Sequence, residues 1–518
     1  MSSEETARML SRFDFNDLFV LEMANNHQGD VEHGKRIIRE LAAVVKKNGV
    51  RAAVKFQFRQ LDSFIHPEHR GRSENKHIPR FLSTRLDRDA FAALATEARA
   101  QGLLPMSTPF DEESVALLEE LDLDIVKVGS CSAKDWPLLE RIADAGKPVI
   151  FSTGGLLLKD IDNLVSFFDH RGVDYAIMHC VSLYPIPEDK FDLGQIDVLR
   201  SRYPRRTIGW STHEAPDETD AVLIAVAKGA RMFERHVGVA TDAITLNTYS
   251  STPAQIDRWL QAYRRAVTLC GRGGGRQPSA EETESLQSLS RGVYLKADVA
   301  SGAIIGRDDV YFAMPWRDGQ IPSGQWREGM VATRDARADE PLAWAAVEYP
   351  PDPPRVAIQS AVHEVKALLN EARIHLGSEF KVEYSHHYGM ESFRKVGCVL
   401  IDCVNREYCK KIIVQLPGQV HPPHFHKRKE ETFQVLHGVL NVELDGHRRV
   451  LHPGETLLVL PGVWHRFWTD TGCVAEEIST THFNDDSVYQ DKKINQMARH
   501  ERKTVVDHWG RFQLPSAT

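Results

Sequence analysis

The stretch AAVKFQ, residues 52–57, joins a short apolar run to a lysine and a glutamine near its carboxyl end. Short apolar runs bounded by polar residues are typical of buried strands. The pattern recurs from Phe19 to about Cys270, and amphipathic stretches of 10 to 16 residues separate the runs. The expected strands are FVLE (19–22), AAVKF (52–56), LLPMS (103–107), DIVKVG (124–129), PVIFST (148–153), YAIMH (175–179), TIGWS (207–211) and RMFERH (231–236).

Strands that alternate in this way with amphipathic helices predict an α/β fold. Eight such units over roughly 250 residues favour a (β/α)8 TIM barrel, and a doubly wound open sheet is the alternative. In a TIM barrel the carboxyl ends of all eight strands gather at one face, where reactive residues lie. The polar residues that end the apolar runs are therefore the first candidates for a functional site.

The composition limits the classes of protein that the chain can belong to. With 518 residues, the chain is long enough for two or three domains. Its net charge is -8 and it has no long basic run, so we expect no nucleic-acid partner. The start, MSSEETARML, has no apolar signal region, and no apolar run reaches 18 residues, which predicts no membrane partner. Seven cysteines without a CxxC pair are typical of a reducing compartment and predict a cytoplasmic protein.

Two breaks divide the chain. The Gly-rich stretch GRGGGRQPSAEE, 271–282, is typical of a linker, and the proline cluster YPPDPPRV, 349–356, is typical of a stiff spacer. We therefore expect a barrel over 1–275, a small domain over 276–348 and a third domain over 349–518. Closely spaced β runs in the third domain, joined by turns such as LDGH and HPGE, predict an antiparallel barrel or jelly roll.

Polar side chains end seven of the eight strands expected in the barrel. They are Glu22, Lys55 with Gln57, Ser107, Lys127, Ser152, Ser211 with His213, and Glu234 with His236. Lysines and serines at one face suit a small phosphorylated anion, because ammonium and hydroxyl groups satisfy phosphate and carboxylate oxygens. His213 and His236, from neighbouring strands, suit a divalent metal with open positions for a substrate carbonyl. The combination indicates activation of an aldehyde beside a phosphorylated anion.

The order of the motifs around these residues resembles that of the N-acetylneuraminate (sialic acid) synthases. The motifs are EMANNHQGD (22–30), VKFQ (54–57), STPF (107–110), KVGS (127–130), STGG (152–155), HCVSLYP (179–185), GWSTHE (209–214) and FERHV (233–237). Members of that family condense phosphoenolpyruvate with an aldose to give a 3-deoxy-2-keto sugar acid and phosphate. The resemblance covers about residues 15–345. It implies a small antifreeze-like (SAF) domain after the barrel and a homodimer, in which the SAF domain reaches the partner subunit's barrel.

The resemblance also assigns roles to matching positions. It implies catalytic roles for Glu22, Lys55, Lys127, His213 and His236, with Glu22 near the water that attacks C2 of phosphoenolpyruvate. It implies that His213 and His236 hold Mn2+ or another divalent ion, which polarises the aldehyde while C3 of phosphoenolpyruvate attacks. The residues expected to contact phosphoenolpyruvate or the aldose are Lys55, Gln57, Lys127, Ser130, Ser152, Ser182, Tyr184, Ser211, Asn247 and Arg317.

The chain departs from the family pattern mainly at positions expected to touch the sugar. An acidic residue of the family becomes Ser132, an asparagine becomes Ser182, and an aspartate becomes Asn247. In the small domain, Met314 replaces an arginine, and Arg317 lies close enough in sequence to substitute for it. The pattern therefore predicts the reaction class better than it predicts the sugar.

The third domain carries a second metal-binding pattern, in HPPHFHKRKEETFQVLHGVL (421–440). Two histidines two residues apart on a strand point to one face, so His424 and His426 can bind one ion. With Glu431 and the later His465 they form a set that suits Mn, Fe, Ni or Zn. The spacing of these residues and of the glycines around them resembles the cupins. His421 and His437 match no ligand position and are expected in loops or on the surface. A helix near 361–376 is expected to precede the β runs.

Within the cupins, residues 355–510 resemble the D-lyxose isomerase type of sugar isomerase. An isomerase needs a base that moves a proton between C1 and C2, for which the candidates are Lys429, Glu430, Glu476 and Glu477. Since Glu476 and Glu477 alternate in direction along a strand, at most one is expected to face the metal. The alternative is that these charges cover the outside of the sheet.

The sequence thus favours a bifunctional enzyme, in which an isomerase cupin supplies the aldose that a synthase barrel consumes. One alternative is a single-activity synthase whose cupin binds sugar or assists assembly without turnover. A cupin epimerase or dehydratase that acts on the synthase product is the third hypothesis.

Overall fold

The computed structural model describes residues 13–70, 74–271, 276–350, 354–377, 380–507 and 509. They form two compact units, one up to residue 277 and one from residue 278 onward. No described helix is both long enough and apolar enough to cross a membrane. The two units are considered separately below.

The first unit is a closed barrel of eight parallel strands, which confirms the predicted fold and excludes the open sheet. Closure is completed where β1 pairs with β8, with Leu18 opposite Met232. All eight strands overlap the predicted runs. Their bounds are β1 (Leu18–Glu22), β2 (Arg51–Phe58), β3 (Leu104–Pro109), β4 (Ile125–Val128), β5 (Val149–Ser152), β6 (Tyr175–Cys180), β7 (Ile208–Thr212) and β8 (Met232–His236).

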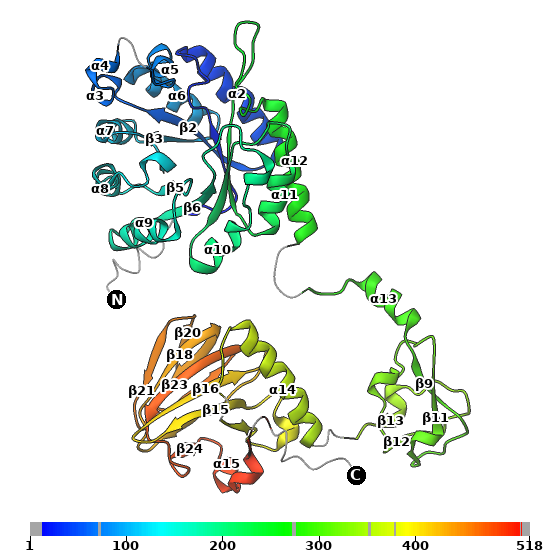
Figure 1. Ribbon diagram of the computed structural model, residues 1–518. Helices are drawn as coiled ribbons and strands as arrows, with labels where there is room; N and C mark the ends of the chain where they lie inside the picture. Colours follow the sequence, from blue (N-terminus) through cyan, green and yellow to red (C-terminus); the bar gives the residue numbers. More distant parts are fainter. Residues whose placement is uncertain are drawn as a thin grey trace. The chain divides into compact units, whose positions relative to one another are not determined.

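Helices surround this barrel on the outside (Figure 1). Between β2 and α6 the chain forms three short helices, so the segment that follows β2 is unusually long. The helices are α2 (Val31–Asn48), α3 (Leu61–Phe64), α4 (Pro67–Arg70), α5 (Ile78–Ser83), α6 (Arg88–Ala100), α7 (Glu112–Glu120), α8 (Trp136–Asp144), α9 (Leu158–His170), α10 (Gln195–Arg202), α11 (Asp220–Ala227) and α12 (Pro253–Cys270).

Strand alternation divides the barrel side chains between two apolar clusters. Outward-facing strand residues such as Phe19 and Phe56 join helix residues such as Trp259 of α12 in the large cluster between strands and helices. Inward-facing residues near the amino ends of the strands, such as Val20 and Ala53, form a smaller cluster in the barrel interior. Because the inner cluster occupies the amino-terminal part of the barrel, inward-facing polar residues farther along each strand lie at the carboxyl-terminal mouth.

The second unit begins with a helix and two small sheets. α13 (Ala280–Leu289) begins inside the predicted linker, because Ser279 caps it by accepting a hydrogen bond from the Glu282 N–H at 3.2 Å. Residues 272–275 of that linker lie outside the described residues. One sheet pairs β9 (Gly292–Leu295) with β11 (Val310–Ala313), and the other orders β10 (Ile304–Ile305), β12 (Met330–Ala332) and β13 (Val347–Glu348). These strands enclose their own apolar cluster.

The rest of the second unit is an all-β fold of two sheets with a long helix before them (Figure 1). The helix, α14, spans Pro354–Glu371, so the prediction of 361–376 was wrong at both ends. A proline suits the first turn of a helix, and Arg373, with a φ of 55°, is in the left-handed conformation that ends one.

One sheet has seven strands and the other has five. The first is ordered β21 (Thr456–Val459), β18 (Glu431–Gly438), β23 (Cys473–Thr480), β16 (Tyr408–Gln415), β15 (Cys398–Asn405), β14 (Lys381–Ser385) and β25 (Lys503–Asp507). The second is ordered β20 (His447–Leu451), β19 (Leu440–Leu444), β22 (His465–Trp468), β17 (His424–His426) and β24 (Ser487–Tyr489). The helices α15 (Lys492–Gln496) and α16 (Arg499–Arg502) lie between β24 and β25 in sequence.

Candidate active site and candidate metal centre

A buried cluster of two lysines and two glutamates lies at the mouth of the barrel. The Glu234 carboxylate pairs with Lys55 Nζ at 3.0 Å and with Lys127 Nζ at 2.7 Å. Lys55 Nζ also pairs with a Glu22 oxygen at 2.6 Å. All four side chains are at most 5% exposed, so the pairs are formed away from bulk water. One carboxylate therefore links strands β2, β4 and β8.

Burial and charge act in opposite directions on these groups. Burial raises the pKa of Glu22, although Lys55 opposes the shift. Burial would also raise the pKa of Glu234, but Lys127 and Lys55 hold that pKa well below its usual value. Burial lowers the pKa of Lys127, against the charge of Glu234. The two positive and two negative charges balance one another, and Glu22 is the carboxylate that binds a proton more readily.

His213 and His236 form a neighbouring pair, with ring centroids 5.3 Å apart. Tyr184 packs 4.0 Å from His213, and Tyr249 packs 5.1 Å from His236, centroid to centroid. Burial lowers the pKa of both histidines to about 3, so each imidazole is neutral near pH 7 and has a lone pair for a metal. His213 Nδ1 lies 3.2 Å from the Val181 carbonyl oxygen, which suits a proton on Nδ1 and leaves Nε2 free.

The serines predicted in the barrel lie close to this cluster or to one another. Ser211 Oγ donates a hydrogen bond to Glu234 at 3.1 Å, and Ser152 is buried at the end of β5. Ser130 Oγ accepts a hydrogen bond from the Gly154 N–H at 3.1 Å. A Cβ atom on Gly154 would lie 2.2 Å from Ser182 Oγ, so only glycine allows this close approach.

The other residues predicted to contact a substrate make no hydrogen bond or ion pair with the lysine–glutamate cluster within the described part of the chain. The half-buried Gln57 accepts a hydrogen bond from Arg59 at 2.9 Å. The Asn247 side chain accepts a hydrogen bond from the Tyr249 N–H at 3.2 Å, within its own turn. Arg317 is exposed in the second unit. Its contact with a substrate stays a prediction.

Sequence reasoning missed the central role of Glu234. It marked Glu234 only as a polar strand end and did not include it among the site residues. The available signal was the alternation in FERHV, which places Glu234 and His236 on the same side of β8. Tyr249, which packs on His236 and Tyr184, was also missed and has no comparable sequence signal.

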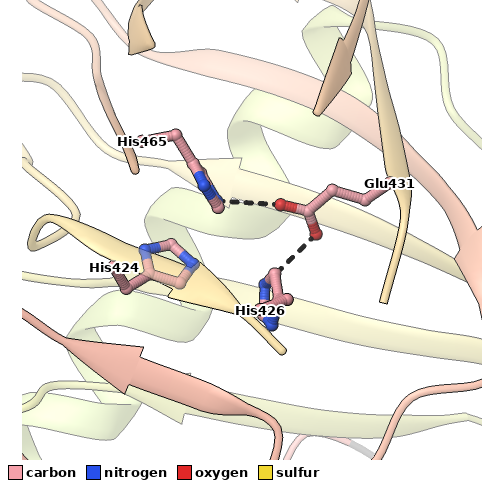
Figure 2. A group of neighbouring side chains, drawn as sticks. All are labelled: His424, His426, Glu431 and His465. Carbon is pink, nitrogen blue, oxygen red and sulfur yellow. Dashed lines mark ion pairs between the residues drawn. The ribbon is translucent and has the colours of Figure 1, made fainter. Parts of the chain in front are cut away.

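A second site lies between the two sheets of the all-β fold (Figure 2). His424 and His426 lie on β17, and His465 lies directly opposite His424 on the paired strand β22. Glu431 reaches the site from β18, which belongs to the other sheet. One ligand atom from each residue lies within 4.8 Å of the others, and all four residues are buried.

The hydrogen bonds of the four residues leave nitrogen and oxygen atoms that could bind a metal ion. His424 Nδ1 and His465 Nδ1 lie 3.1 Å from the carbonyl oxygens of Pro422 and Val463, which suits a proton on Nδ1 and a free Nε2. His465 Nε2 and Glu431 Oε1 are 2.9 Å apart, yet neither buried atom has a hydrogen-bond partner. A divalent cation would satisfy both atoms.

Charged groups lie directly beside these four residues. Lys429 is buried, and its Nζ lies 2.5 Å from a Glu431 oxygen and 2.9 Å from a Glu477 oxygen. Glu476 instead pairs with Lys410 on the opposite face of the sheet, as the alternation along β23 requires. Glu430 is exposed. Burial would lower the pKa of Lys429, but Glu431 and Glu477 hold that pKa above its usual value, so Lys429 is a proton donor. Glu477 is the candidate base that faces the site.

His421 lies in the loop before β17, as one of the two predicted alternatives has it, but it is buried and not on the surface. His421 is 5% exposed and stacks on Phe467, with ring centroids 4.5 Å apart and an interplanar angle of 9°. Its ring lies 4.6 Å from that of His424 and 4.7 Å from that of His387. His421 is buried because the chain enters the space between the sheets before β17 begins, which spacing alone did not indicate. His437 is half-buried on β18.

The barrel mouth thus holds two lysines, paired with two carboxylates, beside two neutral histidines. The model described as "NeuB family" matches residues 42–274, and the one described as "Cupin domain" matches residues 412–476. The chain therefore carries a NeuB family domain in its barrel and a cupin domain in its second unit.

Individual relatives agree with this assignment. The N-acetylneuraminate-9-phosphate synthase of Drosophila melanogaster is 32% identical over 231 residues, which cover 42% of this chain and 59% of that protein. The N,N'-diacetyllegionaminic acid synthase of Campylobacter jejuni is 26% identical over 336 residues, which cover 62% of this chain and 98% of that protein. A crystal structure of a spore coat polysaccharide biosynthesis protein E, described as putative, from Chromobacterium violaceum is 44% identical with a TM-score of 0.63, and covers 64% of this chain and 100% of that chain.

Replacement of Glu234 by glutamine tests the lysine–glutamate cluster. The Glu234→Gln variant leaves Lys127 buried without an opposing charge, so the free energy of unfolding should fall by about 3–5 kcal/mol. Chemical unfolding at pH 7 measures this change. Asp217→Asn, which removes an exposed ion pair with Arg258, is the control and should leave the unfolding midpoint unchanged within error. Equal effects of the two substitutions would contradict a central role for Glu234.

Metal analysis of the purified protein tests the second site. His465→Ala and Glu431→Gln should each lower the bound divalent metal by about one equivalent relative to the wild type, because each removes one of four ligands. His437→Ala, on the same strand as Glu431 but outside the site, is the matched control. The metal-site interpretation fails if His465→Ala retains the full wild-type metal content by elemental mass spectrometry.

Proposed function

We propose that the barrel condenses phosphoenolpyruvate with an aldose to give a 3-deoxy-2-keto sugar acid and phosphate. The observation that carries the proposal is the buried Lys55–Glu234–Lys127 cluster beside the neutral His213–His236 pair at one barrel mouth. Several relatives are named as synthases of sialic or legionaminic acids, which supports the same reaction class.

In this proposal Lys55, Lys127, Ser152 and Ser211 bind the carboxylate and phosphate of phosphoenolpyruvate. His213 and His236 hold a divalent cation, Mn2+ or a similar ion, which when bound supplies Lewis-acid polarisation of the aldehyde. C3 of phosphoenolpyruvate forms the new bond to the aldehyde carbon, a water oxygen adds to C2, and phosphate leaves.

Glu22 has the chemistry to orient that water and accept its proton. Burial raises its pKa, and one of its oxygens already accepts a hydrogen bond from the Ala24 N–H at 2.7 Å, which fixes the orientation of the carboxylate.

Phosphate release from phosphoenolpyruvate in the presence of Mn2+ and a panel of aldoses tests the synthase. Lys127→Met should lower kcat/KM at least about 100-fold, because a cation that stabilises the reacting anion is lost. Lys134→Met, at an exposed lysine near the same loop, should retain activity. The synthase proposal fails if the wild-type protein releases no phosphate with neutral hexoses, N-acetylhexosamines or their phosphates.

We further propose that the cupin isomerises a ketose to the aldose that the barrel consumes. The supporting observation is that Lys429 and Glu477 lie inside the fold beside the four metal ligands, where a proton could be moved, rather than on the outside of the sheet. The cupin metal would be Mn, Fe, Ni or Zn. The alternatives are a cupin that binds sugar or assists assembly without turnover, and an epimerase or dehydratase that acts on the synthase product.

Hydrogen exchange in D2O separates the isomerase from the binding module. The experiment uses the full-length Lys127→Met variant, in which synthase activity should be suppressed. We expect this variant to interconvert a ketose and an aldose and to incorporate deuterium at C1 or C2 of the sugar. Proton NMR measures the incorporation. Lys429→Met should lower this exchange at least about 100-fold, because a positioned proton donor is lost. Lys427→Met, an exposed neighbour, is the control. Sugar binding without any exchange would favour the binding module.

The division into 1–275, 276–348 and 349–518, the antifreeze-like character of the middle segment and the homodimer also remain proposals. The separate apolar cluster of the middle segment supports its independence. Light scattering of the purified chain would detect a monomer, which would exclude the dimer.

A further inference from the structure

Lys55, Gln57 and Arg59, on β2 and just after it, lie one beyond the other toward the opening of the barrel. The outward-facing residues of β2, including Phe56 and Phe58, pack in the cluster beneath the helices. By alternation, Lys55, Gln57 and Arg59 share the opposite, inward side. Four residues of strand separate Lys55 from Arg59, which places the Arg59 backbone about 13 Å farther toward the opening.

The Arg59 guanidinium is held in place without an acidic partner. It lies 3.6 Å from the ring centroid of Phe110 and 4.1 Å from that of Phe81. Its one side-chain hydrogen bond among the described residues goes to the Gln57 oxygen at 2.9 Å. No ion pair joins Arg59 to any described carboxylate. The structure therefore fixes a cation and leaves most of its donors available.

The nearest carboxylates are already committed to other partners. Asp111 accepts hydrogen bonds from the Ser114 N–H at 2.7 Å and the Gln60 N–H at 2.9 Å. Glu22 pairs with Lys55. Burial lowers the pKa of Arg59 to about 10, against weaker opposing effects of Cys131, Glu22 and Asp111. Arg59 thus remains charged at neutral pH in a partly dehydrated position, where a bound anion would be favourable.

A second arginine adds positive charge to the same opening. Arg80, on α5 of the segment after β2, is half-buried and has no ion pair with a described carboxylate. After burial and the two lysines, the charge of Arg80 is among the causes that lower the pKa of His236. Lys55 and Lys127 are balanced by Glu22 and Glu234, whereas Arg59 and Arg80 are not balanced.

We propose that Arg59, assisted by Arg80, binds an anionic group at the end of the acceptor aldose remote from its aldehyde. The acceptor would then be an aldose phosphate or an aldose that carries a carboxylate. This inference rests on the proposed function, because it places phosphoenolpyruvate at Lys55 and Lys127 and the acceptor above it. Gln57, whose oxygen is held by Arg59, presents its amide N–H groups to the middle of the acceptor.

The test compares acceptors that differ only in the remote group. Phosphate release is measured with the full-length protein, phosphoenolpyruvate, Mn2+ and mannose, mannose 6-phosphate or mannuronate. The wild type should prefer one anionic acceptor over mannose by at least about 10-fold in kcat/KM. Arg59→Gln should lower kcat/KM for the anionic acceptor by about 10- to 100-fold and so remove most of that preference. The change should lie mainly in KM of the acceptor, and KM of phosphoenolpyruvate should be unchanged. Arg88→Gln, at an exposed arginine of α6, is the control.

Two outcomes overturn the proposal. One is an Arg59→Gln variant in which KM of phosphoenolpyruvate rises instead, since Arg59 would then bind that substrate. The other is equal loss with mannose and with both anionic acceptors. If no acceptor supports turnover, calorimetry with mannose 6-phosphate and mannuronate in the presence of phosphoenolpyruvate still decides the matter. Binding of either anion that Arg59→Gln weakens would support the subsite even though the synthase had failed, and equal binding by both proteins would refute it.

Discussion

The bridge from the Glu234 carboxylate to Lys55 and Lys127 is the interaction on which the barrel mouth depends. Two ammonium groups at the same end of a closed barrel repel each other, and burial disfavours both charges. The carboxylate between them at 3.0 and 2.7 Å offsets both effects and joins three strands. With the cluster charge balanced, an incoming anion meets positive groups that are already oriented rather than mobile side chains.

The charges at the cupin site are arranged differently from those at the barrel mouth. Here one carboxylate, Glu431, is shared between Lys429 and the histidines, and two atoms of the site remain without hydrogen bonds. A cation, and not an anion, would satisfy those atoms. In the proposed functions, the barrel would take an anionic substrate and the cupin would take a metal together with neutral sugar oxygens. This difference is what makes a sequential reaction on one chain chemically reasonable.

The sequence predicted the elements that follow from periodicity. All eight barrel strands overlap predicted runs because buried strands are short apolar runs, and the cupin ligand set was found because four spacings agree. The predictions failed where the surroundings of a residue, and not its spacing in the sequence, determine its burial or its secondary structure. His421 matches no ligand position, yet it is buried beside His424. The first seven residues of α14 were missed because the proline cluster was interpreted as a spacer rather than as a helix start.

By itself, the sequence determined the barrel, the all-β fold and the candidate anion and metal ligands, since each depends on short-range periodicity or fixed spacing. Only the tertiary structure decided which charges meet. Glu234 lies 107 residues from Lys127 and 179 residues from Lys55, and Lys429 meets Glu477 across 48 residues. The unpaired state of Arg59 likewise depends on where Asp111 and Glu22 find other partners. Pairing of charges is a property of three-dimensional proximity and burial, which no local pattern in the chain encodes.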